Sequence, residues 1–205
     1  MSETEDCCLV IFVKAPVPGK VKTRLVPPLT FESAAALYKG WCVALYKEVN
    51  GLAGVRVVLA YDASPELPTP EWMCAGVRAP EFFLQKGADL GARLIDAFER
   101  SFERGFKRVC VIGTDSPELP MGYIKEAFES LGAHDFVIGP TQDGGYYLAG
   151  MSGRVRAELF RGIEWSTERV YRQTLQKAEE LKLRTHILPE HFDVDTAADL
   201  GKCGG

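Results

Sequence analysis

The sequence predicts an α/β fold in which helices cover both faces of a mostly parallel, Rossmann-like sheet. Short apolar runs alternate with longer stretches in which apolar residues recur every three or four positions, as expected for strands alternating with helices. The alternation continues to about residue 140 without an internal repeat. A chain of 205 residues is long enough to bury a substantial core, so we expect a single domain over residues 1–205.

The clearest expected strand is the run CLVIFVK at residues 8–14, which is apolar on both of its faces. This pattern is typical of a strand in the interior of a parallel sheet. Two further runs have the same character, and three shorter ones are weaker candidates. The six expected strands cover residues 8–14, 55–62, 81–85, 108–113, 136–139 and 145–150.

Four helices are expected from apolar residues spaced three or four positions apart, which place one apolar face against the sheet. The fourth is expected to begin near Ser166, whose hydroxyl suits an N-cap, with Trp165 and Val170 forming a hydrophobic staple around it. The apolar faces of the other three consist of Ala34, Leu37, Trp41 and Leu45, of Leu90, Leu94, Phe98 and Phe102, and of Ile124, Ala127, Phe128 and Leu131.

The composition excludes several classes of protein. Hydrophobic residues at 46% and charged residues at 25% match a globular protein and exclude a disordered or fibrous chain. The net charge of −4 excludes a protein that binds nucleic acid over its whole surface. An anionic partner would therefore have to be bound by a local basic patch.

The chain carries the features of a cytoplasmic protein. None of its six cysteines, Cys203 included, forms a C-x-x-C pair, so we expect reduced thiols and no zinc site. Residues 1–6 are acidic, whereas a signal peptide begins with basic residues. No apolar run approaches the roughly 18 residues that a membrane span requires. We therefore expect a cytoplasmic location and no membrane span.

Ligands of parallel α/β sheets bind at the carboxyl ends of the strands, so the residues that follow each strand are the candidate site. The first strand leads into a basic loop with Lys14, Lys20, Lys22 and Arg24, and residues 7–31 contain no carboxylate. Two prolines and a glycine shape this loop, which suits a polyphosphate. A basic surface loop without a ligand explains the charges equally well. The loop does not match a P-loop, and the chain contains no G-x-G-x-x-G.

The segment after the expected strand at 81–85 opens a helix. Asp89 is the expected N-cap, and the amide groups of the helix N-terminus would face a ligand above the sheet. Gly87 and Gly91 permit the close approach of a ligand or of other backbone, and Gln85 can recognise the edge of a nucleobase. A capped helix start without a ligand is the alternative.

Carboxylates after two other segments suggest a metal site. Asp115 follows the strand at 108–113, and Mg²⁺ typically takes one or two carboxylates together with substrate phosphates. In an extended segment Asp193 and Asp195 would project to the same side. Either Asp195 or Thr196 can also cap the short helix that follows, and Asp115 can serve as a turn residue. Asp195 is our preferred second ligand beside Asp115.

The segment at 139–150 joins two expected strands through a glycine-rich turn. A tight hairpin fully explains Gly144 and Gly145. Asp143 and Tyr147, which flank these glycines, can alternatively frame a pocket for an acceptor molecule. The residues by themselves leave both interpretations open.

Taken together, six motifs resemble the nucleotide-diphospho-sugar transferase superfamily with the GT-A fold. The resemblance runs from about Leu9 to Leu200 and is strongest to an uncharacterised, glycosyltransferase-like branch. It extends to 2-phospho-lactate guanylyltransferases and molybdenum-cofactor nucleotidyltransferases. The motifs are K…PGKxKTRL at 14–25, QxGxDLGxR at 85–93, GTDSP at 113–117, DGG at 143–145, WST at 165–167 and DVDT at 193–196.

The resemblance implies a three-layer α/β/α fold with one antiparallel strand and a nucleotide bound over its first half. It also implies a small-molecule acceptor and Mg²⁺ or Mn²⁺ held by Asp115 and Asp195. The expected catalytic residues are Lys22, Arg24 and Asp115. The implied nucleotide-binding residues are Lys14, Ala15, Pro16, Gly19, Lys20, Gln85, Gly87, Asp89 and Gly91. The implied acceptor-binding residues are Asp143, Gly144, Gly145 and Tyr147.

One departure leaves the reaction open. Sugar nucleotidyltransferases usually begin with Gly-x-Gly-x-Arg, whereas this chain has Pro-Val-Pro-Gly-Lys. The basic loop is larger than a diphosphate requires, which favours nucleotidylyl transfer from a nucleoside triphosphate to a small phosphorylated acceptor. Glycosyl transfer from a nucleotide-sugar is the alternative, and a nucleotide-binding module without catalysis is a second one.

Overall fold

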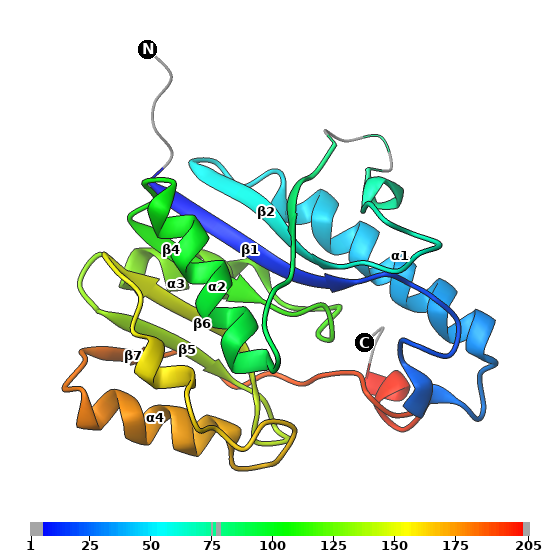
Figure 1. Ribbon diagram of the computed structural model, residues 1–205. Coiled ribbons are helices and arrows are strands. Elements are labelled where there is room, and N and C mark those ends of the chain that lie inside the picture. Colours follow the sequence, from blue (N-terminus) through cyan, green and yellow to red (C-terminus); the bar gives the residue numbers. More distant parts are fainter. Residues whose placement is uncertain (1–5, 75, 77–78, 203–205) are drawn as a thin grey trace.

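Seven strands and four α-helices alternate along the computed structural model, which describes residues 6–74, 76 and 79–202 (Figure 1). The strands are β1 (Cys7–Lys14), β2 (Val55–Asp62), β3 (Glu81–Leu84), β4 (Arg108–Ile112), β5 (Phe136–Pro140), β6 (Tyr146–Ser152) and β7 (Thr185–Ile187). The α-helices are α1 (Phe31–Val49), α2 (Leu90–Glu103), α3 (Met121–Ser130) and α4 (Val170–Glu180). The 3₁₀ helices are η1 (Thr23–Leu25), η2 (Glu71–Met73), η3 (Ala157–Phe160) and η4 (Asp199–Lys202).

The strands form one sheet in the order β3-β2-β1-β4-β6-β5-β7. Strand β6 runs antiparallel to its neighbours β4 and β5, whereas the other pairings of described strands are parallel. The order places β1 and β4 side by side at the centre, so the loops that follow them meet at one edge of the sheet. The predicted α/β fold with a mostly parallel sheet and one antiparallel strand is confirmed.

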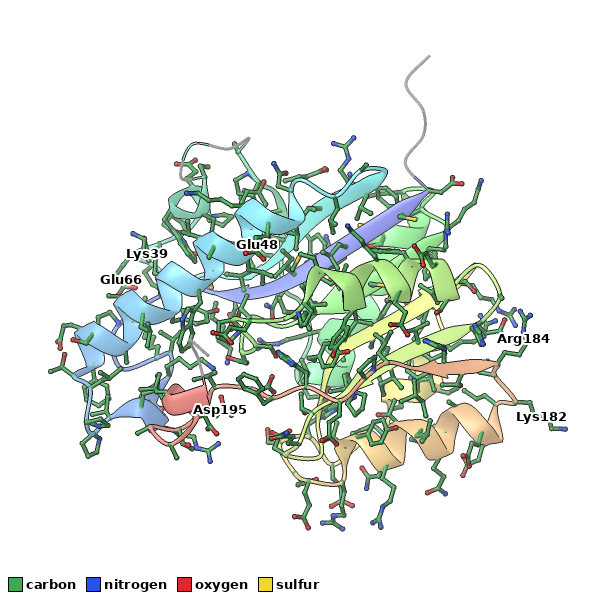
Figure 2. All side chains as sticks on the ribbon, turned by 180° about the vertical axis from the view of Figure 1, so that it is seen from behind. Lys39, Glu48, Glu66, Lys182, Arg184 and Asp195 are labelled. Atoms are coloured by element: carbon green, nitrogen blue, oxygen red, sulfur yellow. The ribbon has the colours of Figure 1, made fainter. Side chains whose placement is uncertain are left out.

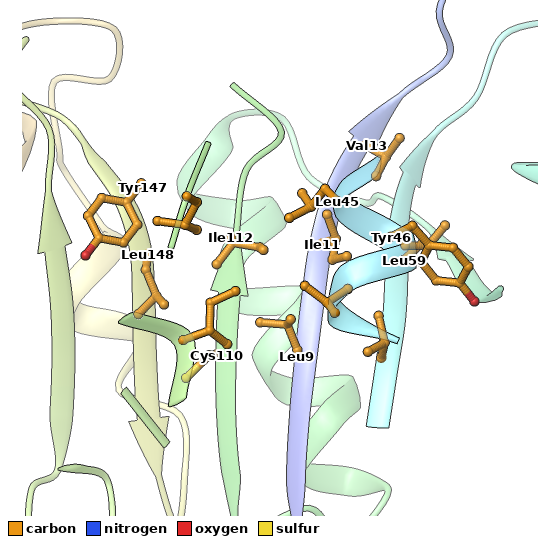
Figure 3. Close-up of a cluster of buried hydrophobic side chains, with 14 of the residues drawn as sticks. Leu9, Ile11, Val13, Leu45, Tyr46, Leu59, Cys110, Ile112, Tyr147 and Leu148 are labelled. Carbon is orange, nitrogen blue, oxygen red and sulfur yellow. The ribbon is translucent and has the colours of Figure 1, made fainter. Parts of the chain in front are cut away.

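Side chains alternate between the two faces of the sheet and build two cores. In β1, Leu9 and Ile11 belong to the core under α1 and α3, whereas Cys8 and Val10 belong to the core under α2 and α4. Figure 3 shows the first of these cores. Each of these β1 side chains is fully buried. This explains why the strand is apolar at every position, and it confirms the layers of helices on both faces.

The predicted start of the fourth helix is wrong. Helix α4 begins at Val170, its N-cap is Arg169, and no side chain caps it. Ser166 has a φ of 63°, in the left-handed region, and belongs to a turn rather than to an N-cap. Within this turn Thr167 Oγ1 donates a hydrogen bond to the Glu164 carbonyl oxygen at 2.7 Å. Because residues 164–167 form this turn, helix α4 begins several residues later than predicted.

Strand β7 is the one described strand for which the sequence analysis has no counterpart. It has three residues, Thr-His-Ile, of which none is buried, so it lacks an apolar run. It exists because it pairs with the end of the sheet at β5. Tertiary pairing, and not local pattern, creates this strand.

The five described cysteines are free, and four of them are buried. Cys203 and the acidic residues 1–5 lie outside the described residues. Across the described part of the chain, no helix is both long and apolar enough to cross a membrane.

Candidate functional site

A cavity of about 630 Å³ opens at the carboxyl ends of the central strands β1 and β4. Its walls come from the loop after β1, the turn after β4, the start of α2, strand β6 and the C-terminal segment around Asp195. Nine of the predicted site residues line it: Lys14, Lys20, Lys22, Arg24, Gln85, Asp89, Asp115, Tyr147 and Asp195.

The basic loop after β1 is fastened to the core by two apolar side chains. Val21, which precedes the N-cap Lys22 of the short helix η1, is 4% exposed, and Leu25, the last residue of η1, is fully buried. Lys22 has a φ of 47° and a ψ of 37°, in the left-handed region. The side chain of Lys22 is only 4% exposed, whereas that of Arg24 is 70% exposed. The loop therefore buries one of its cations and presents another to solvent.

The turn after β4 holds Asp115 between two buried hydroxyl groups. Thr114 Oγ1 lies 2.9 Å from the Tyr38 phenol oxygen, which also accepts a hydrogen bond from the Lys14 backbone N–H at 3.0 Å. Ser116 Oγ donates to Asp193 Oδ1 at 2.5 Å. With both neighbours anchored, the Asp115 side chain, which is 54% exposed, is directed into the cavity.

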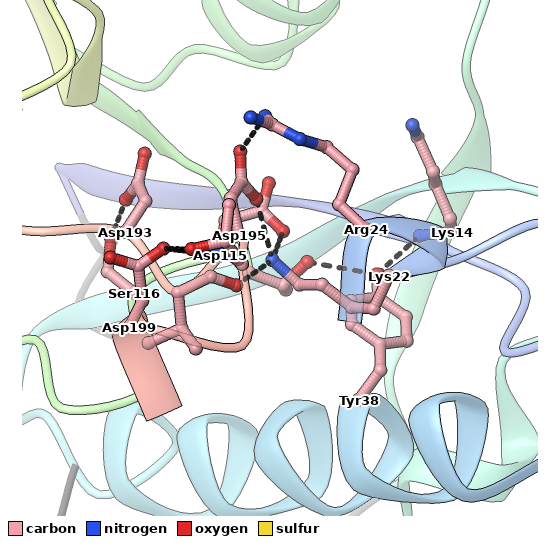
Figure 4. Close-up of polar contacts among 12 residues, drawn as sticks. Lys14, Lys22, Arg24, Tyr38, Asp115, Ser116, Asp193, Asp195 and Asp199 are labelled. Atoms are coloured by element: carbon pink, nitrogen blue, oxygen red, sulfur yellow. Dashed lines mark hydrogen bonds and ion pairs between the residues drawn. The ribbon is translucent and has the colours of Figure 1, made fainter. Parts of the chain in front are cut away.

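The C-terminal segment reaches Asp115 through its backbone. The Val194 N–H donates to the Asp115 carbonyl oxygen at 2.8 Å, and the Val194 side chain is fully buried. These contacts bring Asp195 to the cavity and direct Asp193 toward Ser116 instead. The structure thus brings together Asp115 and Asp195, which are far apart in the sequence (Figure 4).

Lys22 Nζ lies between the two carboxylates (Figure 4). It contacts Asp115 Oδ1, lies 3.2 Å from Asp195 Oδ1 and donates to the Val194 carbonyl oxygen at 2.8 Å. Burial by itself would lower the pKa of Lys22, but the carboxylates of Asp115 and Asp195 together outweigh it and raise that pKa. Lys22 is therefore a charged ammonium whose three donors face three protein oxygens.

Asp193 has a different environment from Asp195. Burial raises its pKa, the Ser116 hydroxyl partly opposes this, and the nearby carboxylates of Asp115, Asp143 and Asp195 raise it further, to about 6. It is absent from the residues that line the main cavity. We expected Asp193 and Asp195 to project to the same side. In the structure they have different partners, because Asp193 contacts Ser116 whereas Asp195 lines the main cavity.

Helix α2 begins at the predicted N-cap. Asp89 Oδ1 accepts a hydrogen bond from the Ala92 N–H at 2.7 Å. Both ends of the Gln85 amide are engaged by protein groups. Its Nε2 donates to the Ala60 carbonyl oxygen at 2.9 Å, and its Oε1 accepts from Arg93 Nη1 at 3.1 Å. In this arrangement Gln85 orients Arg93.

The two glycines of this segment lie against protein backbone. A Cβ atom on Gly87, whose φ is 142°, would lie 2.6 Å from the Arg93 backbone nitrogen. A Cβ atom on Gly91 would lie 2.4 Å from the Phe160 carbonyl oxygen. Close packing explains both residues, and neither lines the main cavity.

The remaining predicted nucleotide-binding residues lie in the β1 loop but outside the cavity lining. The Ala15 N–H donates to the Asp62 carbonyl oxygen at 2.9 Å, and Gly19 has a φ of 79°. Together with Pro16, they shape the loop that carries the cations.

The predicted acceptor residues divide between two places. Asp143 and Gly144 line a separate hollow of about 460 Å³ together with Gln142, Glu168, Arg169 and Arg172. Asp143 Oδ1 also accepts from the Gly145 N–H at 3.1 Å, which closes the turn. Tyr147 lines the main cavity, but its hydroxyl donates to the Pro189 carbonyl oxygen at 3.0 Å.

The donor set around Lys22 Nζ fits a hard divalent cation. Two carboxylates and one backbone carbonyl oxygen converge there, and oxygen is the ligand that Mg²⁺ prefers. Across the part of the chain that the structure describes, no group of three or more His, Cys, Asp or Glu residues is arranged to hold a metal. A cation at Asp115 and Asp195 would therefore complete its ligands with phosphates and water, as Mg²⁺ commonly does.

Several residues of the site have no individually predicted role. Arg93 lines the cavity, and its Nη1 lies 3.3 Å from Asp62 Oδ2 at the end of β2. Asp62 ends an apolar run in the sequence, and this position after a strand is the signal that could have predicted Asp62 as a residue of the site. Tyr38 and Thr114 are buried supports, of which Thr114 belongs to the GTDSP motif and Tyr38 to none of the six motifs.

Charge in the cavity is opposite in sign to that of the whole chain. Five cationic and three anionic residues line it, although the chain has a net charge of −4. The cations are Lys14, Lys20, Lys22, Arg24 and Arg93, and the anions are Asp89, Asp115 and Asp195.

Comparisons with known proteins agree with this description. Residues 45–167 match the protein family described as "Uncharacterized protein conserved in bacteria (DUF2064)". The chain is 34% identical to a "putative nucleotide-diphospho-sugar transferase" from Desulfovibrio desulfuricans G20, with a TM-score of 0.86 over 93% of this chain and 83% of that one. The comparison with curated proteins found no match.

More distant structures share the fold alone. A 4-diphosphocytidyl-2C-methyl-D-erythritol synthase from Anaerococcus prevotii DSM 20548 is 7% identical, with a TM-score of 0.64 over 97% of both chains. A CMP:2-keto-3-deoxy-manno-octonic acid synthetase complexed with CTP is 12% identical, with a TM-score of 0.59 over 96% of both chains. The fold is that of the nucleotide-diphospho-sugar transferases, as the sequence motifs implied.

Proposed function

Since the chain belongs to the DUF2064 family and has the nucleotide-diphospho-sugar transferase fold, we propose that it is a metal-dependent nucleotidylyltransferase. It transfers a nucleotidyl group from a nucleoside triphosphate to a small phosphorylated acceptor. The observation that carries this proposal is the excess of cations in a cavity of an otherwise acidic chain. A triphosphate is the ligand that such a cluster attracts.

The reaction is an in-line displacement at phosphorus. An oxygen of the acceptor phosphate forms a bond to the α-phosphorus while the bond from this phosphorus to the bridging oxygen breaks. Pyrophosphate leaves with the electron pair. Such chemistry depends mainly on positioning and on the stabilisation of charge.

The residues of this chain supply both. Lys14 and Lys20 are exposed in the cavity wall and bind the outer phosphates. Arg24 stabilises the charge on the departing pyrophosphate. Its Nη1 lies 3.4 Å from Asp195 Oδ2. Asp115 and Asp195 would hold Mg²⁺ or Mn²⁺, which neutralises phosphate charge when bound. The hairpin around Asp143 is our proposed acceptor side.

The test is turnover by the Asp115→Asn variant, followed as pyrophosphate release. We expect a loss of about a hundredfold or more because a charge-stabilising or metal-binding group is removed. Glu103→Gln, on the exposed end of α2, is the matched control and should leave turnover unchanged. Near-normal turnover in Asp115→Asn, with a divalent cation still required, would exclude the proposed metal site.

Glycosyl transfer is a second candidate, favoured by the description of the 34%-identical relative as a nucleotide-diphospho-sugar transferase. Thermal-shift measurements with nucleoside triphosphates and nucleotide-sugars, with and without Mg²⁺, separate the two. A ligand at 100 times its Kd adds about 2.7 kcal/mol of stability, which is readily measured. Selective stabilisation by nucleotide-sugars would replace our proposal with glycosyl transfer.

A further inference from the structure

We propose that Lys22 is an internal counter-ion that occupies the position between Asp115 and Asp195 and competes with the divalent cation for it. This inference rests on the proposed function and adds a control of metal binding to it. When the cation binds, the Lys22 ammonium is displaced and becomes available to the phosphates of the nucleotide. Lys22 therefore couples the binding of metal to the binding of nucleotide.

The geometry around Lys22 carries this proposal. Its Nζ contacts Asp115 Oδ1, Asp195 Oδ1 and the Val194 carbonyl oxygen, which are the oxygens a hard cation would use. An ammonium has three N–H donors, and three oxygens face them. While these contacts persist, Lys22 has no donor left for a phosphate group.

The charges make the competition unavoidable. An ammonium and a divalent cation a few ångströms apart repel each other strongly in a partly buried site. They cannot share the same three oxygens. The Asp115 and Asp195 side chains are 54% and 40% exposed, so an incoming cation can reach them from the cavity, whereas Lys22 is 4% exposed.

The position of Lys22 allows the displaced side chain to meet a phosphate. It belongs to the same loop as Lys20 and Arg24, and all three line the main cavity. Its side chain has four flexible methylene groups, so its ammonium can change position by rotation about the side-chain bonds. Displacement would then add a cation to the phosphate site at the moment the metal binds.

Mn²⁺ binding to the nucleotide-free protein, measured by electron paramagnetic resonance, tests the proposal. In Lys22→Met the competing ammonium is gone, so we expect Mn²⁺ to bind at least about tenfold more tightly than in the wild type. Lys39→Met removes an exposed lysine of α1 and is the charge-matched control, with unchanged Mn²⁺ affinity expected (Figure 2). Asp115→Asn in the Lys22→Met background should abolish the gain.

Equal or weaker Mn²⁺ binding in Lys22→Met would overturn the proposal, because the lysine would then not compete. Absence of Mn²⁺ binding in both proteins would overturn it as well. Neither result depends on turnover. The proposed function fails separately, if no nucleoside triphosphate is converted by the wild-type protein under any metal condition.

A measurement on the wild type remains decisive if Lys22→Met does not fold. Amine-reactive labelling, quantified by mass spectrometry for each lysine, reports whether Lys22 leaves its buried position. We expect Mg²⁺ to raise the labelling of Lys22 several-fold and to leave that of Lys39 unchanged. Labelling of Lys22 that does not respond to Mg²⁺ would show that the ammonium stays in place.

Discussion

Asp193 and Asp195 lie two positions apart, yet the fold assigns them different partners. The fully buried Val194 between them donates its N–H to the Asp115 carbonyl oxygen at 2.8 Å. On one side of this anchor Asp193 accepts the Ser116 hydroxyl, and on the other Asp195 faces Lys22. A pattern of two acidic residues therefore yields one carboxylate in the cavity and one that ties the turn after β4 to the C-terminal segment.

The residues at the far end of the sheet provide a pH-dependent contact. Asp135, beside β5, accepts hydrogen bonds from Arg184 Nε and Nη2, each at 3.1 Å, and from the Arg184 N–H at 3.0 Å. These hydrogen bonds, from the guanidinium first and then the backbone, lower the pKa of Asp135. Arg184 and Asp195 lie far apart, on different sides of the molecule, in Figure 2.

Asp135→Asn should therefore lower the stability of the protein at neutral pH. A carboxylate whose pKa is lowered by folding stabilises the native state above its unfolded pKa, and this contribution disappears as the pH falls through the folded pKa. The difference in the free energy of unfolding between wild type and variant, measured with urea, should accordingly shrink as the pH falls through the folded pKa of Asp135. The effect is small because the Arg184 side chain is 68% exposed, so solvent screens the ion pair.

Glu103→Gln on the exposed surface of α2 is the control for Asp135→Asn. Its difference from wild type in the free energy of unfolding should not change over this pH range. A difference between Asp135→Asn and wild type that stays constant down to pH 2 would show that the ionised form of Asp135 does not contribute.

The starts of the helices differ in how far local sequence determines them. Helix α2 begins after Asp89 as predicted, because the hydrogen bond from the Ala92 N–H lies within the same turn. Helix α4 begins four residues after Ser166, and at its start the Tyr171 N–H donates to the Gly144 carbonyl oxygen of the β5–β6 hairpin at 2.8 Å. A cap that depends on neighbouring residues is readable from sequence, and a start that depends on another hairpin is not.

Two glycines at the second position of their helices provide a matched pair. Gly91→Ala in α2 should destabilise the protein by about 1–3 kcal/mol, since its Cβ would lie 2.4 Å from the Phe160 carbonyl oxygen. Gly122→Ala in α3 should be neutral or stabilising by up to about 1 kcal/mol, because nothing lies within 4 Å of its Cβ. Guanidinium unfolding measures both.

Equal effects of the two substitutions would contradict the close packing of α2 on η3. A fall in nucleotide affinity for Gly91→Ala without loss of stability would instead indicate that the space at this position belongs to a ligand.

The sheet separates the two hydrophobic cores of the molecule, and the cavity lies at one of its edges. The cavity takes residues from β1, β4, α2 and the C-terminal segment, so it exists only when these parts are assembled. Both cores use the central strands β1 and β4. Loss of either core removes the support of the other, which favours a single cooperative unit.

Unfolding should therefore be a single transition, as expected for one domain over residues 1–205. Trp72 packs against the core under α1, and Trp165 packs against the core under α2. Two variants, one with Trp72 and the other with Trp165 as its single tryptophan, should each have a denaturant midpoint that is the same by fluorescence and by circular dichroism. The ratio of signal change to denaturant should give no sign of a second transition in either variant. Separate midpoints for Trp72 and Trp165 would contradict the single unit.

The sequence by itself determined the α/β class and six of the seven described strands, each end within two residues of its observed position. It did so because a strand buried on both faces must be apolar along its length, and this requirement is local. It also indicated the two aspartates and the basic loop, through their places after the strands.

The tertiary structure alone decided the pairing of β7, the late start of α4 and the contact of Lys22 with Asp195, which is 173 positions away. It also directed Gln85 toward Arg93 and left Asp193 outside the main cavity. These features depend on which surfaces meet after folding. Neighbours along the chain do not encode such meetings, because each one is determined by the packing of the rest of the molecule.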